Sequence, residues 1–393
     1  MSFRNDFVWG QATSAYQIEG AAFQDGKGWD IWDVFCKEEG KVFEGHSGDV
    51  ACDHYHRFRE DVALMKKMGV QGYRFSINWS RVFPNGTGTV NEKGLKFYHE
   101  LVDELCAANI EPYITLYHWE LPYELYKKGG WMNREIVEWF SDYAAFIAKE
   151  FSDKVTHFFT VNEPQCFIGL GYMTGVHAPG LKVPVRDTFL MAHHVLMAHG
   201  MAVKKMREAA KRDILIGIAP TGSMSYPDSE RPEDIEAARM HLMQVNPDLQ
   251  NWTWNVTWWS DPIFRGEYPE DGLKLYKDYL PTMTPEDMKL ILVTVGLADV
   301  NDQENINNIR NSLKAQVPGT LLNNAQIFHL RGGIDYEKLS FKHRTMMTLL
   351  YHKVKNLPEE KKTAEDRAMI ETFNSKVDFV DYHSLDQIIE AIR

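Results

Sequence analysis

The chain has 393 residues, of which 44% are hydrophobic and 25% charged, which is enough to bury a large core and indicates a soluble globular protein. Its formal net charge of -12 argues against a surface that binds nucleic acid or an anionic membrane, because such surfaces need clustered lysine and arginine. A small neutral substrate fits this composition better.

Short runs rich in β-formers alternate with amphipathic helical patterns through the first 220 residues. Five strands are predicted, over 7–15, 72–79, 111–118, 156–163 and 214–220. Two of the intervening helices are predicted from apolar residues at helical spacing, which are Tyr55, Phe58, Val62 and Met65, with Gly69 after them, and Ile136, Phe140, Tyr143, Ile147 and Phe151. Strands joined by helices indicate parallel βαβ units with right-handed crossovers.

Polar residues gather at the carboxyl ends of these strands. They are Gln17 past the first strand, Asn78 in the second, His118 and Trp119 at the third, and Asn162 and Glu163 at the fourth. A (β/α)₈ barrel builds its active site at this rim, so we predict an α/β fold of the TIM-barrel type with five N-terminal βα units. The polar aromatic stretch at 251–264 is interpreted as a loop with short helices over the same mouth.

Glu163 has two interpretations. Taken alone, it is equally well explained as a helix-start carboxylate, which the helix dipole favours. Its neighbours favour a glycosidase, which needs a proton donor in a partly apolar pocket, hydroxyl-binding amides and imidazoles, and indoles that face sugar C–H groups. Gln17, His118, Trp119 and Asn162 supply these groups from different strands.

Four motifs carry a resemblance to a known family over residues 1–290. They are FVWGQATSAYQIEGA, GDVACDHYHRFREDVALMKKMGVQGYRFSINWSRVFPNG, TLYHWELP and TVNEPQCFIGLGYMTGVHAPG. In content and order they resemble the N-terminal three quarters of a family 1 glycoside hydrolase of the bacterial β-glucosidase type. The resemblance implies a retaining hydrolase that acts on small-molecule β-glucosides.

The resemblance also implies a role for each matching residue. Glu163 corresponds to the general acid/base and Asn162 to the residue that binds the sugar 2-hydroxyl. Gln17, His118 and Trp119 correspond to residues of the glycone subsite. Arg74, in YRFSINW, corresponds to the family's arginine beside the nucleophile.

The second carboxylate of such an enzyme has no counterpart in the sequence. A retaining glycosidase holds its nucleophile ~5–5.5 Å from the acid/base, and in the family this residue belongs to an ITENG-like motif at the end of the seventh strand. The motif does not occur here. Glu304, Asp299 and Asp335 follow later strands, but none has the family's context. Low or absent activity is therefore expected.

The C-terminal segment, 291–393, resembles a different family through VTVGLAD, FHLRGGIDY and HRTMM. It is similar to the C-terminal half of a flavodoxin-like domain, without the phosphate-binding loop, so no FMN and no other cofactor is expected. Its strands, 291–295, 326–330 and 377–381, are predicted to be parallel. Five strands and three strands together would close an eight-stranded barrel, with the 291–296 strand pairing with the 214–220 strand.

Three functional hypotheses follow from these features. The first is an impaired β-glucosidase-like hydrolase, the second a non-catalytic sugar-binding remnant, and the third an FMN-binding flavodoxin-like electron carrier.

No metal site is predicted from the histidines of AHHVLMAHG or CDHYH, because their spacing does not place metal ligands together. Four cysteines without a CxxC pattern predict a reducing cytoplasm. The charged N-terminus is not typical of a signal peptide, and no run approaches the ~18 apolar residues of a membrane span.

Overall fold

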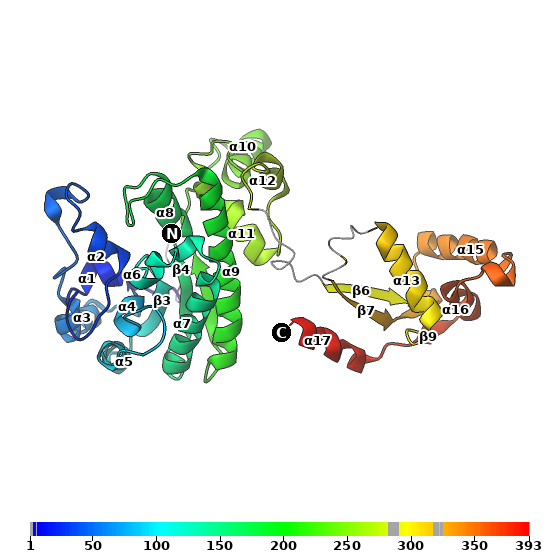
Figure 1. The fold of residues 1–393 in the computed structure, drawn as a ribbon, viewed down its shortest axis with the longest axis horizontal. Helices are drawn as coiled ribbons and strands as arrows, with labels where there is room; N and C mark the ends of the chain where they lie inside the picture. Colours follow the sequence, from blue (N-terminus) through cyan, green and yellow to red (C-terminus); the bar gives the residue numbers. More distant parts are fainter. Residues whose placement is uncertain (1–2, 5, 282–290, 317–321, 323–324, 393) are drawn as a thin grey trace. The chain divides into compact units, whose positions relative to one another are not determined.

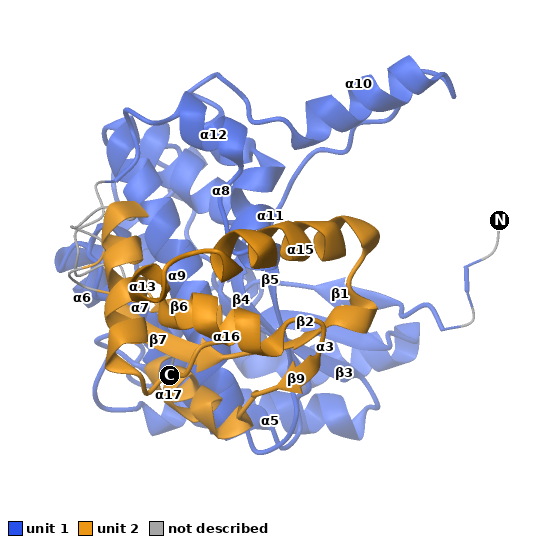
Figure 2. Cartoon of the chain, turned by 90° about the vertical axis from the view of Figure 1, so that its right-hand side faces the viewer, with its two compact units in different colours: residues 1–281 blue, residues 282–393 orange. Residues whose placement is uncertain are grey.

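The computed structural model describes residues 3–4, 6–281, 291–316, 322 and 325–392 (Figure 1). The chain divides into two compact units, residues 1–281 and residues 282–393, which Figure 2 colours separately. We call them unit 1 and unit 2. The predicted boundary at residue 290 lies outside the described residues.

Unit 1 is built on a five-stranded parallel sheet in which each strand pairs with the next along the chain. Its strands are β1 (Gly10–Ala12), β2 (Gly72–Ser76), β3 (Glu111–Tyr117), β4 (His157–Asn162) and β5 (Leu215–Ala219). The five predicted strands and their order are confirmed. The first is shorter than predicted, because the chain turns into a helix at Ala15, whose N–H donates to the buried Ser76 Oγ (2.7 Å).

Helices connect the strands of unit 1 (Figure 1). The longest are α3 (His54–Met68), α5 (Glu92–Ala107), α7 (Ile136–Phe151) and α9 (Val185–Ala209), one between each pair of consecutive strands. The shorter ones are α1 (Ala15–Ile18), α2 (Ile31–Phe35), α4 (Trp79–Val82), α6 (Tyr123–Lys127), α8 (Pro164–Ile168), α10 (Pro232–Met243), α11 (Val256–Phe264) and α12 (Glu270–Leu275). Gly69 ends α3 with a φ of 77°, the left-handed conformation that glycine adopts readily.

The helices bury the apolar faces that their sequences predict. In α7 every predicted core residue is buried, and the helix packs lengthwise against α9 (Figure 1). In α3, Phe58, Val62 and Met65 are buried in the same core. In the part of the chain that the structure describes, no helix combines the length and the apolar character that crossing a membrane requires.

The aromatic stretch at 251–264 forms a 3₁₀ turn, η4 (Trp252–Trp254), followed by α11, as predicted. Most of its indole side chains are more deeply buried than expected for a loop over the mouth of a barrel. The buried Trp252 stacks on Phe189 of α9 with ring centroids 3.9 Å apart, and Trp258 and Trp259 are buried beside it. Trp254 alone of the four is well exposed, at 40%.

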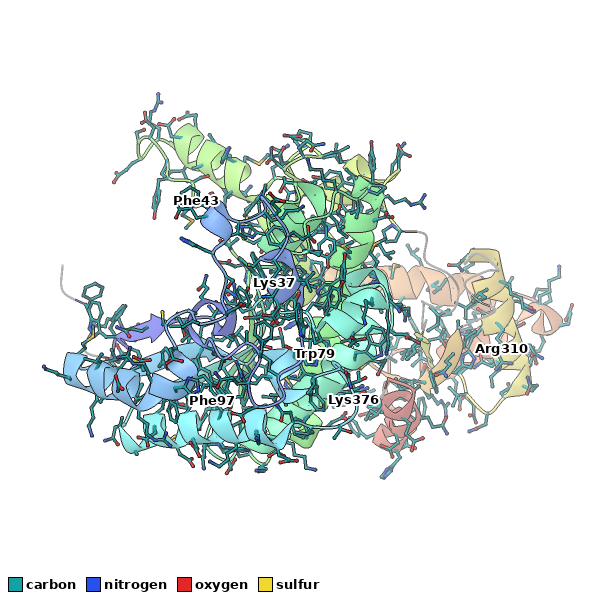
Figure 3. The ribbon with its side chains drawn as sticks, turned by 60° about the vertical axis from the view of Figure 1, so that its left-hand side comes forward. Lys37, Phe43, Trp79, Phe97, Arg310 and Lys376 are labelled. Carbon is teal, nitrogen blue, oxygen red and sulfur yellow. The ribbon has the colours of Figure 1, made fainter. Side chains whose placement is uncertain are left out.

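Replacing Trp79 by alanine is expected to destabilise unit 1 by about 3–5 kcal/mol, because it removes a fully buried aromatic side chain. The Trp79 ring lies parallel to Tyr143 at 4.8 Å, and its Nε1–H donates to Gly86 O (2.9 Å). Urea unfolding followed by tryptophan fluorescence measures the loss, since every tryptophan precedes residue 260 and so reports on unit 1. The 78% exposed Phe43→Ala should change little; both residues are labelled in Figure 3.

Unit 2 contains a parallel pair of strands joined through a helix. The strands are β6 (Ile291–Gly296) and β7 (Gln326–Arg331), and α13 (Gln303–Gln316) lies between them in the chain. Its other elements are β8 (Gly333–Asp335), α15 (Phe341–Lys355), α16 (Ala364–Thr372), β9 (Lys376–Asp378) and α17 (Asp386–Ile392).

Two predictions about these strands are wrong. Among the described residues, β6 pairs with β7 and β5 pairs with β4, so the 291–296 strand does not extend the first sheet and the eight strands do not form one barrel. The connection from β6 to β7, residues 297–325, is much shorter than that from β5 to β6, residues 220–290, which favours β7 as the partner of β6. The strand predicted at 377–381 is the three-residue β9, which pairs antiparallel with β8 rather than parallel.

Candidate active site

The carboxyl ends of the strands in unit 1 bring the predicted site residues to one rim. Gln17 lies in α1 directly after β1, and His118 and Trp119 follow β3. Asn162 ends β4 and Glu163 comes next. Because the strands are parallel and adjacent, side chains from distant parts of the sequence meet here.

Asn162 is held from two neighbouring strands. Its Oδ1 accepts from Arg74 Nη2 (2.5 Å), and its carbonyl accepts from Trp119 Nε1 (2.9 Å). Arg74 also donates from Nε to Thr115 Oγ1 on β3 (2.8 Å). These bonds fix the amide of Asn162, so that its remaining hydrogen-bonding capacity is available for a ligand.

Arg74 is a half-buried cation in the middle of this network. Its guanidinium lies over the Phe159 ring, 4.8 Å from the centroid. Loss of hydration lowers the pKa of Arg74, and the negative charge of Glu163 opposes this shift in part. The site therefore places a permanent positive charge beside the candidate acid.

Arg74→Lys is expected to lower the free energy of unfolding of unit 1 by about 1–3 kcal/mol, because an ammonium cannot reproduce the fork that bonds both Thr115 and Asn162. Tryptophan fluorescence in urea measures this change. As a matched control, Arg59→Lys at an exposed pair with Glu100 should alter stability by less than about 1 kcal/mol. Equal effects of the two substitutions would contradict a structural role for the Arg74 fork.

Glu163 occupies a left-handed backbone conformation (φ 43°, ψ 66°) at the start of α8. Its N–H donates to Ala219 O at the end of β5 (2.7 Å), which anchors it between the ends of β4 and β5. Its carboxylate makes no capping hydrogen bond to α8. Glu163 therefore does not serve as a side-chain cap of α8.

The surroundings of Glu163 include a thiol one helical turn away. The pKa of Cys166 is raised to about 12, first by burial and then by the charge and the hydrogen bond of Glu163. The thiol is therefore neutral at physiological pH and acts as a hydrogen-bond donor to the carboxylate rather than as a nucleophile.

His118 and Trp119 form one wall of the site. Burial lowers the pKa of His118 to about 4, so the imidazole is neutral at physiological pH. The two rings lie 5.0 Å apart, and the Trp119 ring lies 5.6 Å from that of His177. A neutral imidazole beside an indole offers both a hydroxyl partner and an apolar platform.

A cavity of about 420 Å³ opens beside this wall. Its lining combines Gln17, His118 and Trp119 with Trp32, His177 and the segment 42–51. Trp32 and His177 were not predicted as site residues, although His177 lies within a motif that carries the family resemblance. A cavity with aromatic sides and a few amide and imidazole groups suits a small polar ring such as a sugar.

Three buried carboxylates of unit 1 are engaged elsewhere. Glu120 Oε1 accepts from Tyr16 N–H (3.0 Å), and Asp30 pairs with Lys27 (3.1 Å). Glu19 pairs with Arg81 (2.9 Å) in the buried core.

The acids singled out in the C-terminal segment are likewise engaged within unit 2. Asp335 accepts from the N–H of Glu337, and Asp299 accepts from the N–H of Asn301. Glu304 pairs with Arg367 (3.8 Å).

The histidines of AHHVLMAHG bond to protein groups rather than to one another. His194 Nδ1 bonds Trp131 O (2.8 Å), His199 Nδ1 bonds Thr160 Oγ1 (2.7 Å), and His193 Nδ1 bonds Tyr268 OH (2.9 Å). Within the described ranges, no three His, Cys, Asp or Glu side chains are grouped so as to hold a metal ion.

Comparison with protein-family models shows which family the chain belongs to. The model of glycosyl hydrolase family 1 matches residues 1–323. The chain belongs to glycosyl hydrolase family 1. The family match continues past residue 290, where the predicted resemblance ends, and takes in β6 and α13. Solved members imply a (β/α)₈ barrel, of which unit 1 contains five strands.

Several family 1 relatives match most of the chain. β-Glucosidase A of Acetivibrio thermocellus is 48% identical over 304 residues, which are 77% of this chain and 65% of the relative. The 1,4-β-D-glucan glucohydrolase of Thermotoga neapolitana is 45% identical over 300 residues, covering 76% and 68%. The chain thus spans about two thirds of the length of these relatives. The structure of a family 1 β-glucosidase from Thermotoga maritima matches with a TM-score of 0.64 at 36% identity, over 85% of this chain and 79% of that one.

Proposed function

We propose that unit 1 carries the glycone half of a retaining β-glucosidase and acts on the glycosidic bond of small β-glucosides. Glu163 donates a proton to the glycosidic oxygen, so that the aglycone leaves as a neutral alcohol, and in the absence of a second carboxylate a water molecule forms the new bond to the anomeric carbon. The observation that best supports this proposal is that Glu163, Asn162 and His118 converge at the ends of adjacent parallel strands.

The neighbouring groups have roles in binding the sugar. Asn162, fixed by Arg74 and Trp119, presents its amide to the 2-hydroxyl. Gln17 and the neutral His118 bond other hydroxyls, while the Trp119 indole faces the C–H groups of the ring. All four cysteines are free thiols, which supports the proposal that the protein works in a reducing cytoplasm.

We propose further that turnover by this chain alone is low. Charge develops at the anomeric carbon as the aglycone leaves, and a second carboxylate on the opposite face normally takes up the sugar as a covalent intermediate. The ITENG-like motif that supplies it in the family does not occur in the sequence. The alternative function, a non-catalytic sugar-binding remnant, also rests on the absence of this motif from the sequence.

For unit 2 the proposal is a flavodoxin-like βα fragment that carries no FMN. The parallel pairing of β6 and β7 through α13 is consistent with such a fragment. An electron-carrier function predicts a yellow protein with flavin absorbance after purification, and a colourless preparation excludes it.

The test compares the release of p-nitrophenol from p-nitrophenyl β-glucoside by three proteins, which are the chain, its Glu163→Gln variant and the Acetivibrio β-glucosidase A. We expect the relative to be fastest, the chain much slower and the variant slowest. Release that is indistinguishable from buffer, together with saturable binding of glucose, would support the sugar-binding alternative. A rate unaffected by Glu163→Gln would overturn the assignment of the acid.

A further inference from the structure

Gln165 is a fully buried polar side chain to which the proposed reaction gives no role. It is the second residue of α8, two positions after Glu163, and every residue of that helix is buried. Its amide pairs with the backbone of Thr221. Nε2–H donates to Thr221 O (2.8 Å), and Thr221 N–H donates to Oε1 (3.3 Å). One side chain therefore satisfies both backbone polar groups of a residue that lies far away in the sequence.

This pair continues the contact between β4 and β5 beyond the end of the sheet. The two strands lie side by side (Figure 2), and their register ends at Asn162 opposite Ala219. Glu163 N–H then donates to Ala219 O (2.7 Å), whereas Pro164 has no N–H with which to add a further bond. Beyond this point the side chain of Gln165 replaces the backbone and holds the chain that follows β5.

The segment that Gln165 holds has no regular structure of its own. Residues 220–228 form no helix or strand, and most of them are exposed. The carbonyl that accepts from Glu163 N–H belongs to Ala219, directly before this segment. A shift of the segment would therefore be transmitted to the bond that anchors Glu163.

The backbone conformation of Glu163 makes this anchor important. It lies in the left-handed region (φ 43°, ψ 66°), which residues other than glycine adopt only where the surrounding structure holds them there. A backbone that relaxed into a common conformation would point the carboxylate in another direction. A displacement of about 1 Å at a reacting group can slow a reaction on the order of 100-fold.

We propose that Gln165 is a positioning residue for the acid. By bonding Thr221 it keeps the end of β5 against Glu163, and so fixes the direction of the Glu163 carboxylate. Gln165 is inaccessible and lies outside the lining of the 420 Å³ cavity, so it acts through Glu163 rather than on the sugar. The catalytic role rests on the proposed function of Glu163, whereas the link between α8 and Thr221 rests on the hydrogen bonds alone.

The test is Gln165→Met, which keeps the length of the side chain and removes both hydrogen bonds. Hydrolysis of phenyl β-glucoside, whose leaving group needs a proton, should slow about 10- to 100-fold. Hydrolysis of 2,4-dinitrophenyl β-glucoside, whose leaving group departs without a proton, should slow less than about threefold. Hydrogen exchange measured by mass spectrometry should become faster at 160–166 and 219–223.

Two control variants separate positioning from general damage. Thr221→Ala should leave both rates and the exchange unchanged, because Gln165 bonds the backbone of Thr221 and not its side chain. Gln71→Met removes a comparable bond, from Trp9 N–H to Gln71 Oε1 (2.9 Å), just before β2 and at the opposite end of the sheet. It should leave the ratio of the two rates unchanged.

A third variant covers the case in which Gln165→Met does not fold. Gln165→Glu keeps the acceptor for Thr221 N–H and loses the amide donor to Thr221 O, so the ratio of the two rates should lie between those of the wild type and Gln165→Met.

Each other outcome overturns a defined part of the inference. Unchanged exchange in Gln165→Met overturns the link between α8 and Thr221. Equal slowing of both substrates, or a wild-type ratio in Gln165→Met where Glu163→Gln changes the ratio, overturns the positioning role. If Glu163→Gln leaves the ratio unchanged, or if neither substrate is hydrolysed above the buffer rate, the proposed function fails and the positioning role fails with it.

Discussion

Glu163→Gln is expected to slow the hydrolysis of phenyl β-glucoside by a factor on the order of 10² to 10⁴, the usual contribution of a general acid. Phenol is a poor leaving group that needs a proton as the glycosidic bond breaks. The dinitrophenolate of 2,4-dinitrophenyl β-glucoside leaves without one, so the same substitution should slow its release much less. Comparing the two substrates isolates proton donation from any general damage to the site.

The matched control is Glu270→Gln, which alters a carboxylate that is 83% exposed on α12 and paired with Lys274. It should leave both rates unchanged. If Glu163→Gln slowed both substrates by the same factor, Glu163 would be acting in binding or folding rather than as the acid. The assay can use the chain alone, since the ratio between the two substrates is independent of the absolute rate.

Glu120→Gln is expected to change how stability depends on pH. Glu120 is 1% exposed, its Oε1 accepts from Tyr16 N–H, and its Oε2 has no hydrogen-bond partner among the described residues. Burial first, and then the charge of Asp30, raises the pKa of Glu120 to about 8. The side chain is therefore neutral at pH 7 in the folded protein and ionised in the unfolded chain.

The direction in which stability changes with pH follows from proton linkage. Between the ordinary pKa of 4.5 and the folded value of about 8, the folded state binds more protons than the unfolded state, so stability falls as the pH rises. An amide does not titrate, so the variant should gain roughly 3 kcal/mol over the wild type between pH 4.5 and pH 7. Urea unfolding of both proteins across this range measures the difference.

Two buried histidines shift the wild-type profile in the opposite direction. Burial lowers the pKa of His118 and of His199 to about 4, so the folded state binds fewer protons than the unfolded state between pH 4 and 6.5, and stability rises with pH there. Both proteins share this contribution, so it cancels in the comparison. Parallel pH profiles of wild type and Glu120→Gln would contradict a neutral, buried Glu120.

The predicted elements of unit 1 came from patterns that depend on local sequence. Apolar spacing located α3 and α7, and β-rich runs located the five strands. The periodicity of the apolar residues within a segment indicates both its secondary structure and the face that it buries. The shared rim followed from the parallel order, which brings strand ends together. The sequence did not predict the contact of Trp32 and His177 with the cavity, because Trp32 lies on the short helix α2 and His177 in a loop, and the order of the strands sets the position of neither.

The strand pairing of the C-terminal segment could not be predicted in the same way. Counting strands suggested one closed barrel, yet β6 pairs with β7 and the short β9 pairs antiparallel with β8. Strand number does not specify which edges are complementary, whereas a short βαβ connection favours a local partner. The hydrogen bond from Tyr16 N–H to Glu120 could not be predicted either, because the two residues are far apart in the chain.

Hydrogen exchange in the presence of deoxynojirimycin, which is bound in one solved Thermotoga maritima β-glucosidase, tests the central claim most directly. If Gln17, His118, Asn162 and Glu163 form one sugar site, saturating ligand should slow exchange together at 15–19, 117–121 and 160–166, and Trp119→Ala should remove all three effects. Unchanged exchange at these segments, or protection confined to one of them, would contradict the account.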